Sequence, residues 1–125
     1  HESKIAVIGF AFKGEPETSD LRDSTTIWFL EELKKKAANI VGYDPVIPKE
    51  HLEELGIQSS KDIYSAVVDS DVVVLFNNHL SYKEIDIQKT INLIKKPAIF
   101  YDCWGMLYKS DISRCKDINY MGVGF

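Results

Sequence analysis

The chain has 125 residues, close to the commonest size of a single domain, so we expect one hydrophobic core in one domain spanning residues 1–125. Its apolar fraction of 45% and charged fraction of 27% exclude a disordered or fibrous protein. The formal net charge of -4 disfavours nucleic acid as a partner, and no apolar run approaches the roughly 20 residues that span a membrane.

The first expected elements alternate between strand and helix. Residues 4–10 form an apolar run with a glycine near its end, which is typical of a strand buried on both faces. Residues 24–38 carry apolar side chains every three or four positions and predict an amphipathic helix. Residues 39–43 predict a second strand, which ends at Asp44 and Pro45 because proline disfavours regular structure before it.

The rest of the chain continues this alternation. The expected elements are helices over 48–55 and 61–68, a strand over 71–76, a helix over 85–95, and strands over 98–102 and 118–123. Strands and helices that alternate at this spacing predict right-handed crossovers between parallel strands. The fold class is therefore α/β, a doubly wound, mostly parallel sheet in a Rossmann-like three-layer sandwich.

Ligands of such sheets bind outside the carboxyl ends of the strands, which makes the loop of residues 10–23 the leading candidate. The other loops expected at this edge are 44–49, 77–82 and 102–108. The first loop carries neither familiar glycine motif. Gly9 lacks the second glycine of a dinucleotide fingerprint, and Glu15 follows Gly14 where a phosphate-binding loop needs lysine.

Two cations of this loop, Lys13 and Arg22, are candidates for phosphate binding. A guanidinium can bind a phosphate through two hydrogen bonds, and an ammonium acts as a compact charge. In the alternative interpretation, Lys13 is solvated and Arg22 forms an exposed ion pair with Asp20 or Asp23. The residues alone leave both interpretations open.

The cysteines and histidines predict neither a metal site nor a catalytic residue. Two isolated cysteines are too few for a disulfide framework or a zinc site, so a reduced, cytoplasmic location is expected. Cys103 lies nearer the ligand edge, but an inert, half-buried thiol is the favoured interpretation, and Cys115 is expected in a polar surface loop. We expect His79 to bond the loop backbone and His51 to lie on the surface.

Several short motifs resemble the C-terminal nucleotide-sugar-binding domain of the UDP-glucose/GDP-mannose dehydrogenase family. They are Phe10-Ala11-Phe12-Lys13, Asp20-Leu21-Arg22-Asp23-Ser24, Tyr43-Asp44-Pro45 and Gly122-Val123-Gly124. The resemblance covers nearly the whole chain, and the motifs occur in the family's order. Two features depart from the family pattern. The loop 14–21 is about two residues longer than in many members, and Cys103-Trp104-Gly105 stands where many members carry an arginine that contacts the substrate.

The resemblance implies an enzyme that oxidises the C6 hydroxyl of a UDP-sugar to a carboxylate with NAD, for polysaccharide biosynthesis. It implies that Phe12 and Lys13 contact the nucleotide sugar and that Arg22 contacts the cofactor. NAD and the catalytic residues would belong mainly to other domains of the same polypeptide, so this domain alone is not expected to be active. The full enzyme is expected to be a homodimer. A stand-alone Rossmann-like nucleotide-binding or regulatory module without catalysis is the alternative.

Overall fold

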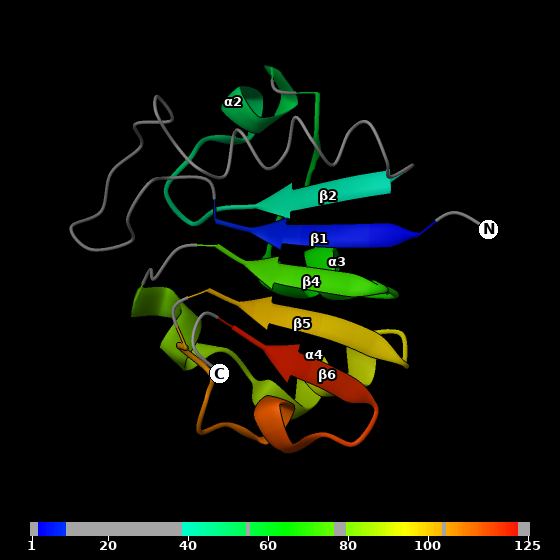
Figure 1. Ribbon diagram of the computed structural model, residues 1–125. Coiled ribbons are helices and arrows are strands. Elements are labelled where there is room, and N and C mark those ends of the chain that lie inside the picture. Colours follow the sequence, from blue (N-terminus) through cyan, green and yellow to red (C-terminus); the bar gives the residue numbers. More distant parts are fainter. Residues whose placement is uncertain (1–2, 10–38, 55, 77–79, 104, 123–125) are drawn as a thin grey trace.

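A parallel sheet organises the protein (Figure 1). The computed structural model describes residues 3–9, 39–54, 56–76, 80–103 and 105–122. Within these segments the sheet has six strands in the order β3-β2-β1-β4-β5-β6, and every adjacent pair is parallel. The strands are β1 (Lys4–Ile8), β2 (Asn39–Tyr43), β3 (Gln58–Ser59), β4 (Val72–Leu75), β5 (Ala98–Asp102) and β6 (Ile118–Met121). The Rossmann-like α/β fold class predicted from the sequence is confirmed.

The helices of the described segments are short. They are the α-helices α2 (Lys49–Glu54), α3 (Ile63–Val67) and α4 (Ile87–Leu93) and the 3-10 helices η1 (Leu80–Glu84) and η2 (Asp111–Arg114). The three α-helices lie within the predicted helical ranges, whereas β3, η1 and η2 were not predicted. The helix predicted over 24–38 lies outside the described residues. None of the described helices has the length and apolar character that crossing a membrane requires.

The sheet separates two hydrophobic clusters, because successive strand residues point to opposite faces. In β1, Ala6 and Ile8 belong to the larger cluster, while Ile5 and Val7 belong to the smaller one. The larger cluster also takes side chains from α3, α4 and η2, and the smaller one takes Leu52 from α2. Figure 1 accordingly shows α2 apart from α3 and α4. The prediction that the opening strand is buried on both faces is therefore confirmed.

Two features of this architecture position a ligand site. The strand order reverses between β1 and β4, and in α/β sheets ligands bind near such a reversal, outside the carboxyl ends of the strands. Gly9 follows β1 with φ of 100°, a left-handed conformation that glycine adopts without steric cost. Its N–H donates to the Tyr43 carbonyl over 2.9 Å, which ties the ends of β1 and β2 together.

Candidate functional site

The candidate site is the carboxyl edge of the sheet. The three residues predicted to bind ligands, Phe12, Lys13 and Arg22, lie outside the described residues, so their roles stay predictions. The described part of this edge consists of the turn after β2, the helix η1 after β4 and the segment after β5. Each of these segments has a distinct chemistry.

The turn after β2 is shaped by a buried carboxylate. Asp44 Oδ1 accepts hydrogen bonds from the N–H groups of Val46 at 2.8 Å and Ile47 at 3.1 Å. Ile47 is buried in the smaller cluster, so the turn directs the chain from the sheet edge towards α2. These contacts give Asp44 of the Tyr43-Asp44-Pro45 motif a structural role.

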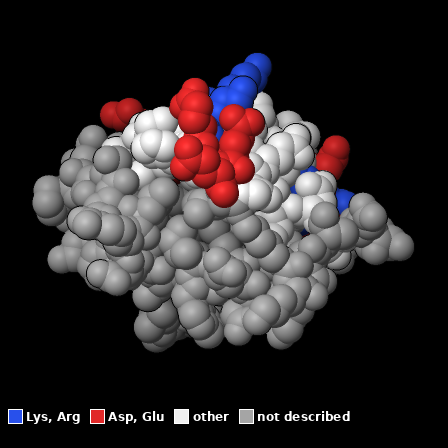
Figure 2. Space-filling view, turned by 90° about the horizontal axis from the view of Figure 1, so that it is seen from above, with Lys and Arg blue, Asp and Glu red and all other residues white. Residues whose placement is uncertain are grey.

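The surface of α2 is acidic. Figure 2 looks onto the molecule from the α2 end and shows Asp and Glu side chains gathered there, with Lys and Arg beside them. The helix itself carries Glu50, Glu53 and Glu54, and all three are exposed. Negative charge of this density repels a diphosphate, which disfavours phosphate binding at the described part of this surface.

A small hollow of about 220 Å³ lies where β2 ends beside α3 and η1. The lining residues include Tyr43, Asp62, Tyr82 and Glu84, and none of those that the structure describes is a lysine or arginine. Burial, followed by the charges of Asp44 and Asp62, raises the pKa of Tyr43 above its ordinary value. Burial, followed by the charge of Asp44 and by Tyr43, raises the pKa of Tyr82. The described lining of the hollow is therefore phenolic and anionic.

The segment after β5 is built around a second buried carboxylate. Asp102 ends β5 with none of its surface exposed. Its Oδ1 accepts from the Met106 N–H at 3.1 Å, and its Oδ2 accepts from the Leu107 N–H at 2.8 Å and from the Tyr120 hydroxyl at 2.7 Å. Burial, followed by the hydrogen bond to Asp102, raises the pKa of Tyr120. From the sequence, this segment was expected at the ligand edge, but no role was expected for Asp102.

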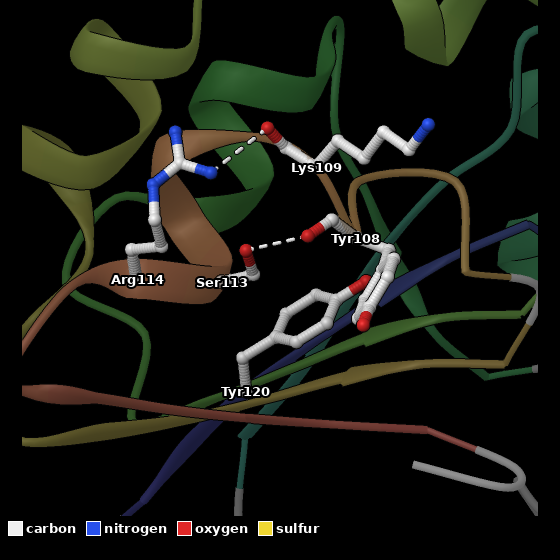
Figure 3. Close-up of a pocket in the computed structure, with 5 residues that line it drawn as sticks. All are labelled: Tyr108, Lys109, Ser113, Arg114 and Tyr120. Carbon is white, nitrogen blue, oxygen red and sulfur yellow. Dashed lines mark hydrogen bonds between the residues drawn. The ribbon is translucent and has the colours of Figure 1, made fainter.

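An open hollow of about 720 Å³ adjoins this segment (Figure 3). Its lining combines the aromatic side chains of Tyr108 and Tyr120 with Lys109, Ser113 and Arg114. Tyr108 is 57% exposed. In Figure 3 the Arg114 guanidinium points to the Lys109 carbonyl, to which it donates at 3.1 Å, and the Ser113 hydroxyl donates to the Tyr108 carbonyl at 2.6 Å. Much of the polar lining thus already serves the internal structure of the segment.

The other polar candidates that the structure describes are structural or lie on the surface. Burial and the charge of Asp102 raise the pKa of Cys103 to about 11, so its half-buried thiol stays protonated near neutral pH, as expected for an inert cysteine. His51 is exposed as predicted, and His79 lies outside the described residues. Among the residues that the structure describes, no group of histidines, cysteines and carboxylates could hold a metal ion.

Cys115 lies in the turn between η2 and β6, and its neighbours Arg114, Lys116 and Asp117 are exposed, as expected for a polar surface loop. Its own side chain is half-buried and packs against the larger hydrophobic cluster. The helix η2 that precedes it is anchored by Ile112, which is fully buried in that cluster. The Ile112 side chain therefore holds η2 and the turn that follows it against the larger cluster.

Comparisons with known proteins show which proteins the chain is similar to. Residues 6–115 match the UDP binding domain of the UDP-glucose/GDP-mannose dehydrogenase family. The chain is 29% identical over 124 residues to a UDP-glucose 6-dehydrogenase of Rhizobium meliloti, covering 98% of the chain and 27% of that protein. It is 31% identical over 115 residues to the UDP-glucose 6-dehydrogenase of Bos taurus, covering 81% of the chain and 23% of that protein.

The fold is also similar to that of a solved structure. The structure of a UDP-D-ManNAc dehydrogenase from Pyrococcus horikoshii aligns with a TM-score of 0.77 at 21% identity, covering 98% of the chain and 26% of that protein. At this identity the likeness concerns the fold alone. The chain spans about a quarter of the length of all three proteins.

Proposed function

The chain belongs to the UDP-glucose/GDP-mannose dehydrogenase family, and from that premise we propose that it binds the UDP part of a nucleotide sugar. The full protein would be an NAD-dependent UDP-sugar 6-dehydrogenase that oxidises the C6 hydroxyl of the sugar to a carboxylate. The observation that carries the proposal is the match of residues 6–115 to the family's UDP binding domain. Because the relatives are several times longer than this chain, they favour a domain of a larger enzyme over a stand-alone module.

The role of such a domain is positioning. Binding energy from the uridine and the diphosphate, which are remote from the reacting carbon, can hold the sugar in a reactive orientation. Effects of this kind supply several kcal/mol of a reaction barrier, on the order of 7–11 kcal/mol in the best-oriented cases. In this proposal Phe12 and Lys13 contact the nucleotide sugar at the carboxyl edge, and Arg22 reaches the cofactor.

The residues of this chain do not by themselves fit NAD. Gly9 directly follows β1, and its left-handed φ accounts for a turn there. In the sequence, Ala11 stands at the position of the second glycine of a dinucleotide fingerprint, between Phe10 and Phe12. NAD would therefore be held mainly by the remainder of the polypeptide. In this proposal the full enzyme is a cytoplasmic homodimer.

Calorimetric titration of the chain with UDP, UDP-glucose and NAD tests the proposed ligand. We expect heat of binding from the two uridine ligands and little from NAD, because the chain lacks a dinucleotide fingerprint. Binding of NAD without binding of either uridine ligand would contradict the proposal.

Substitutions test the proposed contacts in the enzyme that carries this domain. Lys13→Ala and Arg22→Ala should each lower kcat/KM by roughly tenfold or more, since a charge-assisted hydrogen bond contributes about 1.5–3 kcal/mol. Lys116→Ala is the matched control, because Lys116 is an exposed cation in the turn before β6 and lies away from the carboxyl edge. Kinetics of both variants equal to those of the control would remove these two residues from the proposed site.

A further inference from the structure

Asp102 is one of two buried carboxylates among the residues that the structure describes, and the proposed reaction gives it no part. It ends β5 at the carboxyl edge, and the segment of residues 105–108 follows shortly after it in the chain. The carboxylate faces back onto that segment and not into solvent. Buried charge of this kind is costly unless it is hydrogen-bonded, so its partners indicate what it holds in place.

Three hydrogen bonds that Asp102 accepts come from two different parts of the chain. Two donors are backbone N–H groups of the segment itself, Met106 at 3.1 Å and Leu107 at 2.8 Å. The third is the Tyr120 hydroxyl of β6, at 2.7 Å and 18 residues away in the sequence. Hydrogen bonds to an ionised acceptor are roughly twice as strong as neutral ones, so Asp102 fixes the segment to the neighbouring strand.

Two packing contacts complete this arrangement. Leu107 donates one of these N–H groups, and its side chain is buried in the larger cluster. The Tyr120 ring stacks on Phe100 of β5, with centroids 6.0 Å apart and an interplanar angle of 29°. Gly105 has φ of 66°, which lets the chain reverse between Asp102 and these donors. The segment thus has one defined shape at the carboxyl edge.

We propose that Asp102 is a positioning residue for the nucleotide sugar: with Tyr120, it holds residues 105–108 in the conformation that forms one wall of the binding site. This inference rests on the proposed function, because it takes the carboxyl edge to be the place where UDP binds. A wall fixed before binding spares the ligand the entropy of ordering a loop, so Asp102 contributes to affinity without contacting the ligand.

Two variants of the full-length enzyme test the proposal. Asp102→Asn removes the charge and turns an NH2 group towards N–H or O–H donors, while Tyr120→Phe removes one donor and keeps the stacked ring. Asp117→Asn is the matched control, since Asp117 is exposed in the turn before β6 and its side chain lies outside this network. The readouts are the Kd for UDP, KM and kcat with UDP-glucose, and exchange of the Met106 and Leu107 amides.

For Asp102→Asn we expect the Kd for UDP and the KM to rise by on the order of tenfold, with kcat nearly unchanged, because binding is lost equally in the ground and transition states. Tyr120→Phe should act in the same direction with about a threefold effect. Amide exchange of Met106 and Leu107 should accelerate in both variants and not in the control. If Asp102→Asn does not fold, Tyr120→Phe decides the question.

Two results would overturn the proposal. A wild-type Kd and KM in a folded variant whose amides exchange faster would show that Asp102 serves the fold alone. A fall in kcat at constant KM would assign Asp102 to the chemical step instead. A wild-type enzyme that does not bind UDP would refute the proposed function itself, an outcome that the wild-type titration identifies before any variant is measured.

Discussion

Removal of the cap on α3 should produce a stability loss that depends on pH. Asp62 precedes the five-residue helix, and its Oδ1 accepts from the Ser65 N–H at 2.7 Å. A helix this short is not stable alone, so it depends on its cap and on the burial of Ile63, Ala66 and Val67. Replacing a capping Asp by Ala costs about 1 kcal/mol, within a range of about 0.5–2 kcal/mol. We expect Asp62→Ala to lower the free energy of unfolding by this amount at neutral pH.

The pH dependence follows from the pKa of Asp62. The hydrogen bond from the Ser65 backbone, with further help from Lys61 and Lys89, lowers this pKa below its ordinary value of 3.8. The folded state therefore binds the proton less tightly than the unfolded state does. The carboxylate contributes its full stabilisation above the unfolded pKa and loses it as the pH falls through the lower folded pKa. The difference in the free energy of unfolding between wild type and Asp62→Ala should therefore become smaller as the pH falls.

Urea unfolding followed by far-UV circular dichroism measures this gap at about pH 7 and about pH 3. Asp62→Asn separates charge from hydrogen bonding, because asparagine caps a helix about as well as aspartate does but does not titrate. Its stability should be close to that of wild type at neutral pH and should show less pH dependence. An Asp62→Ala gap of equal size at both pH values would refute the attribution to the ionised cap.

Two further outcomes are expected from the packing and the thiol chemistry. Leu52→Ala should lower the free energy of unfolding by about 2–5 kcal/mol in urea and release α2, because Leu52 is buried in the smaller cluster. Ile99→Ala, at a position that is 41% exposed, should lower it by less than about 1 kcal/mol. Equal losses in the two variants would contradict this assignment of the core. Cys103 should react slowly with iodoacetamide, since a pKa of about 11 leaves about one thiol in a thousand ionised at about pH 8. Mass spectrometry distinguishes its labelling from that of Cys115. Labelling of Cys103 as fast as that of free cysteine would refute the raised pKa.

Local periodicity was enough to predict much of the fold. The predicted strands 39–43 and 98–102 have the observed bounds of β2 and β5, and the burial of Ile63, Ala66 and Val67 in α3 follows their spacing. These features depend on side chains a few residues apart, and such spacing is visible in the sequence. The two residues of β3 carry no such signal, because only their pairing with Val41 and Gly42 of β2 makes them a strand.

The sequence by itself determined the fold class, most of the elements, the family resemblance and the loops of the ligand edge. Only the tertiary structure shows the hydrogen bonds of Asp102, the packing of Cys115 against the larger cluster and the anionic residues that line the hollow beside α3. The physical reason is that these properties depend on groups far apart in the sequence. The Tyr120 hydroxyl reaches Asp102 only because β6 pairs with β5, and no periodic pattern encodes that distance.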